Sequence, residues 1–175
     1  KKTYSFISSH YNSIISIHLS KLASGTYQSA LNASKKNRLK KIEVIDSASA
    51  SVGLGLLAMY AVDLKQSGKS FKKIISMVNQ KKNDIELYAI FDDLKYIVRG
   101  GRVPSKIKTI ANLFRLRPVL GVKKGKLKPR GVLYGKSRVI NKLAYFLSTK
   151  IKSEQKYRLL VAHSNAKERG NKLMQ

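Results

Sequence analysis

The apolar run Ile14-Ile15-Ser16-Ile17-His18-Leu19 is followed closely by Ser24-Gly25-Thr26-Tyr27-Gln28-Ser29-Ala30. The first segment is typical of a β-strand, and the second predicts a helix that begins among small residues. Ser24 can cap that helix, Gly25 lets another group approach the backbone, and Thr26 adds a second hydroxyl. Because the first N–H groups of a helix lack partners and carry partial positive charge, this turn can bind an anion.

A second strand is expected at 42–46, after a helix over 25–37. Strand, helix and strand joined by short links form a βαβ unit, so we expect the two strands to be parallel. The second strand is again followed by small residues, at 46–51, and by a helix that runs to about Ser67. Ligands of parallel sheets bind at the carboxyl ends of strands, so two hydroxyl-rich turns favour a site there. Serine and threonine are also common as plain helix caps.

The rest of the chain predicts a second domain with a mixed sheet. We therefore expect an α/β protein with a parallel βαβ-type first domain over 1–68 and an α+β second domain over 69–175. The further elements expected are helices at 3–11, 71–82, 93–99, 106–115, 137–151 and 166–175, strands at 85–91 and 157–163, and a hairpin of 118–123 with 128–134 around Gly125.

The chain is strongly basic, with 36 Lys and Arg against 9 Asp and Glu and a net charge of +27. Such a balance suggests a nucleic-acid-binding module. The basic residues are spread along the chain without interleaved aromatic residues, and tryptophan is absent. A spread of this kind is more typical of a solvated surface, so nucleic acid stays an alternative partner.

Several classes of site are excluded by composition and motif. The chain has no cysteine, which excludes disulfides and thiolate zinc sites, and it has no metal-ligand motif such as HExxH. No apolar run approaches the roughly 20 residues of a membrane span, and the N-terminus lacks a signal-peptide core. We therefore expect a cytoplasmic protein without a metal or cofactor.

Two further residues are candidates for chemistry. Arg102 follows two glycines and presents a planar donor fork suited to carboxylate or phosphate, although the glycines can equally end a helix beside a surface arginine. His163 ends a predicted strand, where a lone histidine is more often structural. A hydrolase with Ser24 as nucleophile and His163 as base is a further alternative, but the G-x-S-x-G elbow is missing.

Several short motifs follow one another along almost the whole chain. After the segment 14–30 come Ile45-Asp46-Ser47, Ser51-x-Gly53-Leu54-Gly55, Asp92-Asp93-Leu94-x-Tyr96, Gly100-Gly101-Arg102, Leu116-Arg117-Pro118-Val119-Leu120, Gly125-Lys126-Leu127-x-Pro129, Arg138 and Val161-Ala162-His163. This ordered set resembles the DegV family of bacterial fatty-acid-binding proteins. The family pattern also has an N-terminal segment and a C-terminal strand that this sequence lacks, so we expect it to be a piece of a longer protein.

The resemblance implies that a long-chain fatty acid lies in a tunnel between two domains. It implies that Ser24, with Gly25 and Thr26, binds the carboxylate, and that Arg102 and His163 lie near the acyl phosphate or the kinase partner. Such proteins are carriers, not enzymes; they present the fatty acid to a separate fatty-acid kinase.

A tunnel for an alkyl chain needs apolar walls. Candidates for these walls, each of which could instead be a plain core residue, are Leu54, Leu56, Leu57, Ile110, Leu113 and Phe114. The positive charge could attract an acidic kinase surface, an anionic membrane surface or nucleic acid.

Overall fold

The computed structural model describes residues 2–36, 41–103, 106, 116–123, 125–135 and 138–175. Its contacts divide the chain into two compact units. The first consists of Lys1–Leu87 with Val122–Lys126, and the second consists of Tyr88–Gly121 with Leu127–Gln175.

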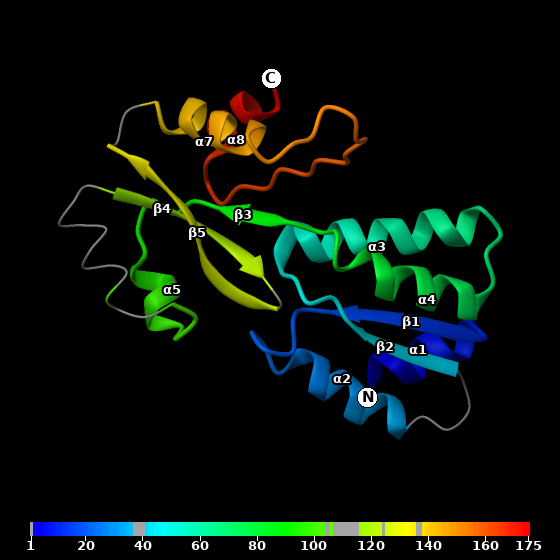
Figure 1. Cartoon of the computed structure of the whole chain (residues 1–175). Coiled ribbons are helices and arrows are strands. Elements are labelled where there is room, and N and C mark those ends of the chain that lie inside the picture. Colours follow the sequence, from blue (N-terminus) through cyan, green and yellow to red (C-terminus); the bar gives the residue numbers. More distant parts are fainter. Residues whose placement is uncertain (1, 37–40, 104–105, 107–115, 124, 136–137) are drawn as a thin grey trace. The chain divides into compact units, whose positions relative to one another are not determined.

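The first unit is built on a pair of parallel strands (Figure 1). Ser13 lies opposite Lys41 at one end of the pair, and His18 lies opposite Asp46 at the other. This pairing confirms the βαβ unit expected from the sequence. The elements are α1 (Lys2–His10), β1 (Ser13–His18), α2 (Thr26–Lys35), β2 (Lys41–Asp46), α3 (Ser51–Gln66) and α4 (Phe71–Lys81).

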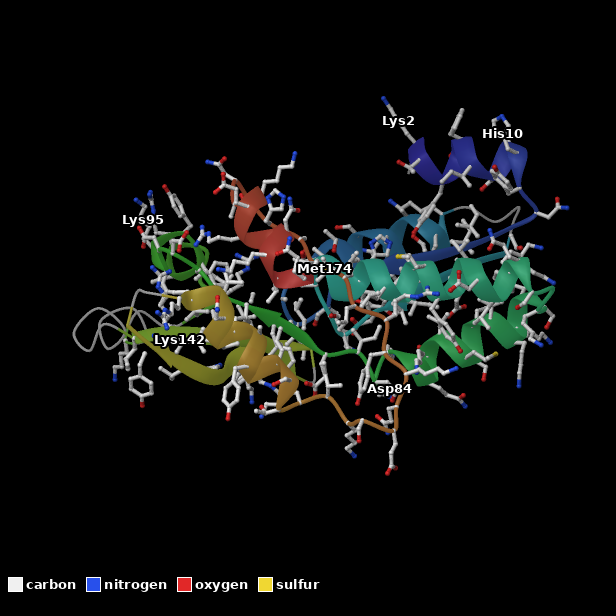
Figure 2. The ribbon with its side chains drawn as sticks, turned by 90° about the horizontal axis from the view of Figure 1, so that it is seen from above. Lys2, His10, Asp84, Lys95, Lys142 and Met174 are labelled. Atoms are coloured by element: carbon white, nitrogen blue, oxygen red, sulfur yellow. The ribbon has the colours of Figure 1, made fainter. Side chains whose placement is uncertain are left out.

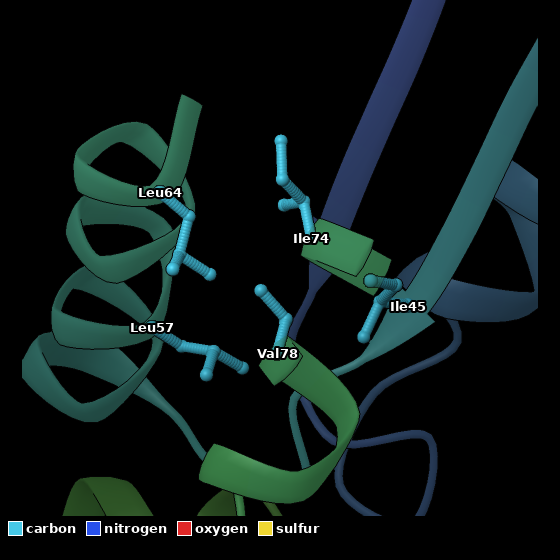
Figure 3. Close-up of a cluster of buried hydrophobic side chains, with 5 residues drawn as sticks. All are labelled: Ile45, Leu57, Leu64, Ile74 and Val78. Carbon is cyan, nitrogen blue, oxygen red and sulfur yellow. The ribbon is translucent and has the colours of Figure 1, made fainter. Parts of the chain in front are cut away.

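Both faces of the strand pair are covered by helices. Val44 and Ile45 are neighbours on β2 and point to opposite faces, as the alternation of a strand requires. On one face, α3 and α4 supply a core of Ile45, Leu57, Leu64, Ile74 and Val78 (Figure 3). On the other face, α1 and α2 enclose a cluster of Tyr4, Ile14, Ala30 and Val44.

A three-stranded sheet has the order β3 (Leu87–Ala89), β4 (Leu116–Lys123) and β5 (Lys126–Tyr134), and all of it except Leu87 and the segment Val122–Lys126 belongs to the second unit. Val119 and Leu120 of β4 are fully buried on opposite faces of this sheet. Val119 packs with Leu133 and α7, and Leu120 packs with Leu94 and Val103. The helices of this unit are α5 (Lys95–Arg99), α7 (Val139–Ser148) and α8 (Lys167–Met174).

Helix α4, which the sequence analysis assigned to the second domain, belongs to the core of the first unit. Its Ile74 and Val78 are 3% and 0% exposed and pack against Ile45 and Leu57. The compact units accordingly divide at Leu87, later than the boundary expected at 68/69.

The strand expected at 157–163 is wrong. This segment has no β-structure, and Leu159 remains 64% exposed. A run of apolar residues becomes a strand only when a neighbouring strand accepts its backbone hydrogen bonds, and the pattern alone cannot supply that neighbour. The helix expected at 106–115 lies outside the described residues, apart from helical Lys106.

Candidate functional site

The turn between β1 and α2 places two hydroxyl groups at the start of a ten-residue helix. Helix α2 begins at Thr26 with Gly25 as its N-cap, one residue later than the Ser24 cap expected from the sequence. The Ser24 hydroxyl nevertheless accepts the Thr26 N–H at 3.3 Å and donates to Thr26 Oγ1 at 3.3 Å. Both contacts are long, so they leave the hydroxyl easy to redirect toward a ligand.

This helix start is open and carries no negative charge of its own. Gly25 and Thr26 are exposed and Ser24 is half-buried. A side chain at Gly25 would meet no atom within 4 Å, and the first turn of α2 has no acidic residue. The N-terminus of α2 is therefore accessible and electrostatically suited to an anion.

The backbone of Ser20 connects this turn to the second strand end. The Ser20 N–H donates to the Ser49 carbonyl at 2.9 Å. The Ser20 carbonyl accepts the N–H groups of Ala23 at 2.9 Å and Ser24 at 3.0 Å. The path of the chain into α2 is thus fixed by hydrogen bonds to a single residue, which is only 1% exposed.

The turn after β2 differs from the first, although both are rich in small hydroxyl residues. Ser47 is fully buried, and its hydroxyl donates to the Ser49 carbonyl at 3.2 Å and accepts the Ser49 N–H at 3.1 Å. The Asp46 carboxylate accepts the N–H groups of Ala48 at 2.8 Å and Lys21 at 3.2 Å. The Asp46 and Ser47 side chains therefore stabilise the turn itself, whereas Ser51, the first residue of α3, is exposed, as Thr26 is at the start of α2.

The candidate tunnel residues fall into three groups. Leu57 is fully buried in the core of α3 and α4, which favours the interpretation as a core residue. Leu54 and Leu56 on the same helix are half-buried. Ile110, Leu113 and Phe114 lie outside the described residues.

Arg102 and His163 both lie in the second unit and are exposed. Gly100 ends helix α5 as its C-cap, and the Arg102 guanidinium folds back to donate to the Gly100 carbonyl. His163 Nδ1 accepts the N–H of Ala166, the N-cap residue of α8, at 3.3 Å. In this arrangement Arg102 completes a helix end, and His163 supports the start of another.

One charged cluster was not anticipated from the sequence. Arg169 of α8 binds both carboxylate oxygens of Asp92, at 2.9 and 2.6 Å, and Arg117 of β4 adds a third contact at 2.6 Å. Hydrogen bonds from Arg169 and then from Arg117 hold the pKa of Asp92 far below its usual range. Because 77 residues separate Asp92 from Arg169, no local pattern indicates this pairing.

Across the described residues, His, Asp and Glu do not gather in groups of three or more that could hold a metal ion. None of the helices described is both long and apolar enough to cross a bilayer.

Comparison with known proteins relates this arrangement to a family. A family model described as "Uncharacterised protein, DegV family" matches residues 1–175. A DegV domain-containing protein of Clostridium perfringens is 33% identical over 162 residues, which cover 89% of this chain and 55% of that protein. A DegV domain-containing protein of Staphylococcus aureus is 36% identical over 115 residues, which cover 66% of this chain and 41% of that protein. The chain thus spans about half the length of the relatives it matches.

Solved structures show the same fold. DegV, a fatty acid binding protein from Bacillus subtilis, matches with a TM-score of 0.82 and 27% identity, covering 99% of this chain and 62% of that one. A DegV family protein from Eubacterium eligens loaded with heptadecanoic acid matches with a TM-score of 0.81 and 21% identity. The match covers 94% of this chain and 60% of that one. Because the family model matches every residue and these folds agree with it, the chain belongs to the DegV family.

Proposed function

We propose that this chain binds a long-chain fatty acid and holds its carboxylate at the Ser24-Gly25-Thr26 turn. The observation that carries the proposal is the open start of α2, with two hydroxyls and no acidic residue in the first turn. The ligand class follows from the relatives, since the Bacillus subtilis protein is described as fatty-acid-binding and the Eubacterium eligens protein holds heptadecanoic acid.

The chemistry of the turn suits a carboxylate. The Ser24 and Thr26 hydroxyls can each donate to a carboxylate oxygen, and the first turn of α2 adds the positive end of the helix dipole. A carboxylate accepts such bonds as an ion, and hydrogen bonds to charged groups are stronger than those between neutral groups.

The experiment is lipid mass spectrometry of the purified chain, followed by titration with a fluorescent long-chain fatty acid. Ser24→Ala removes one charge-assisted hydrogen bond, so we expect a loss of about 1.5–3 kcal/mol, or roughly 10- to 150-fold in affinity. Ser29→Ala, an exposed serine one turn further along α2, is the matched control and should bind normally. Equal affinity in the Ser24→Ala variant and the wild type would contradict the proposal.

We further propose that the chain acts as a carrier in the cytoplasm, presenting the carboxylate to a separate fatty-acid kinase that forms the acyl phosphate. Arg102 and His163 are the residues proposed to meet the phosphate or the kinase. The Arg102 guanidinium is exposed and suits a phosphate oxygen. Arg102→Ala should therefore retain fatty-acid affinity while losing kinase-dependent acyl phosphate formation. If Arg102→Ala supports the kinase as well as the wild type does, this assignment fails.

A further inference from the structure

The tip of the β4–β5 hairpin contacts the turn that carries Ser24. This tip, Val122–Lys126, belongs to the first unit. The Ser20 hydroxyl donates to the Gly125 carbonyl at 2.5 Å and accepts the Leu22 N–H at 3.2 Å. Both Ser20 and Gly125 are buried, although 105 residues separate them. The hydroxyl thus joins two distant segments within one compact unit.

The contact leaves no room for a side chain larger than that of glycine at position 125. Gly125 has a φ of +75°, a conformation that favours glycine. A Cβ atom there would lie 2.7 Å from Ser20 Oγ and 3.4 Å from Leu22 Cδ1. The first of these distances is shorter than a normal contact, so a larger residue at position 125 would displace the Ser20 hydroxyl from the Gly125 carbonyl.

Ser20 also holds the backbone of Ser24, because its carbonyl accepts the Ala23 and Ser24 N–H groups at 2.9 and 3.0 Å. The side chain of Ser20 therefore binds the tip, and its main chain binds the approach to α2. A shift of Ser20 would be transmitted directly to Ser24.

We propose that Ser20 and Gly125 are positioning residues, whose contact holds the Ser24 hydroxyl and the start of α2 in the arrangement that binds a carboxylate. This inference rests on the proposed fatty-acid function for its ligand, but its structural part stands on the contacts alone. Without the contact, the turn samples other conformations, and the ligand binds only the fraction that remains in place.

The first experiment needs no ligand and measures amide hydrogen exchange of Ala23 and Ser24. Ser20→Ala removes the hydroxyl, and Gly125→Ala introduces the clash; each should speed exchange at these two amides by about tenfold. Gly68→Ala is the matched control, since Gly68 has a φ of +74° and a Cβ there meets nothing within 4 Å. It imposes the same backbone strain and should leave the two amides unchanged.

The double variant sharpens this test. Ser20→Ala deletes the oxygen that a Cβ at Gly125 would meet. Adding Gly125→Ala to Ser20→Ala should therefore speed exchange of the Ala23 and Ser24 amides by clearly less than the sum of the two single effects predicts. Full additivity would overturn the direct contact. If Gly125→Ala does not fold, amide exchange in Ser20→Ala, which removes a single oxygen, still tests whether the contact holds Ala23 and Ser24.

The second experiment measures affinity for a fluorescent long-chain fatty acid. Ser20→Ala and Gly125→Ala should each lose about tenfold, no more than Ser24→Ala, while Gly68→Ala loses stability without losing affinity. If the wild type binds no fatty acid, the proposed function fails, and the exchange measurement alone tests whether the Ser20–Gly125 contact holds the start of α2. If the wild type binds and the two variants match it in both exchange and affinity, the inference is overturned.

Discussion

His18 ends a short chain of polar groups on the α1 and α2 side of the strand pair. The Tyr4 hydroxyl donates to Ser16 Oγ at 2.7 Å, and Ser16 Oγ lies 2.8 Å from His18 Nε2. Tyr4 is buried and anchors α1 to β1 through this chain. A neutral His18, whose Nε2 accepts the Ser16 proton, completes it. Burial lowers the pKa of His18 from 6.5, which favours the neutral ring.

We expect this histidine to make folding sensitive to mild acid. Because the pKa of His18 is lower in the folded chain, the unfolded chain binds its proton first, so stability falls as the pH falls below about 6.5. Urea unfolding between pH 8 and pH 5 measures the effect. His18→Gln, which cannot gain this proton, should flatten the profile; an unchanged profile would show that His18 does not contribute.

At the scale of elements, α3 carries residues with two different interpretations. Leu57 lies in the core and Leu54 is half-buried on the same helix, yet the sequence offers both as walls of a tunnel. The distinction depends on which side of α3 meets α4. That contact is made by Ile74 and Val78, whose placement the sequence analysis assigned to the other domain.

Leu57→Ala separates the two roles. A core residue that is fully buried should cost about 2–5 kcal/mol of unfolding free energy when cut back to alanine. Leu54→Ala, at a half-buried position, is the comparison and should cost less. Chemical denaturation of both variants gives the answer, and a Leu57→Ala variant as stable as the wild type would return Leu57 to the ligand-binding candidates.

The contacts of Asp92 attach α8 to the sheet of the second unit. The side chains of Arg169 and Asp92 are 44% and 54% exposed, so solvent weakens the electrostatic attraction between them. We expect Arg169→Ala to lower stability by about 1 kcal/mol, helped by the two-pronged geometry. Since the pKa of Asp92 is lowered in the folded chain, this contribution is present above about pH 4 and is lost on further acidification.

Amide exchange in α8 tests this attachment. Arg169→Ala should speed exchange there, whereas Lys172→Ala, which removes another exposed cation from the same helix, should change it little. Equal exchange in both variants would mean that the ion pairs do not hold the helix.

For the whole molecule, the excess of positive charge is distributed over the surface of both units, as the exposed Lys2 and Lys95 illustrate (Figure 2). Such a surface attracts anionic partners at long range, but it gives no specificity for one anionic partner over another. The proposed kinase contact, an anionic membrane surface and nucleic acid all share this attraction, so charge alone does not identify the partner.

Salt distinguishes these possibilities. Binding to DNA or RNA through lysine and phosphate weakens steeply between about 50 and 200 mM salt. Fatty-acid affinity, which depends on an alkyl chain and a local carboxylate site, should change much less over that range. Parallel titrations with a fluorescent fatty acid and a labelled oligonucleotide make the comparison. Oligonucleotide affinity that is tight at about 50 mM salt and falls steeply toward about 200 mM would favour the alternative function, and a flat salt response would exclude it.

Local patterns predicted much of this fold because its first half is made of sequence neighbours. The parallel pairing of β1 and β2 and the helix after Ser24 follow from adjacent segments. What could not be predicted depends on distant partners. The segment 157–163 has strand-forming residues without a paired neighbour. Likewise, Ser24 and Ser47 look alike in the sequence, and only their burial separates an open hydroxyl from an internal one.

The Ser20–Gly125 contact also constrains how this chain can change in length. A hairpin turn at the surface usually tolerates extra residues, since nothing depends on where its tip lies. Here the Gly125 carbonyl must reach the Ser20 hydroxyl, so one inserted residue would carry it out of range. Insertions and deletions should therefore be accommodated in other loops, and the spacing between β4 and β5 becomes a fixed length rather than a variable one.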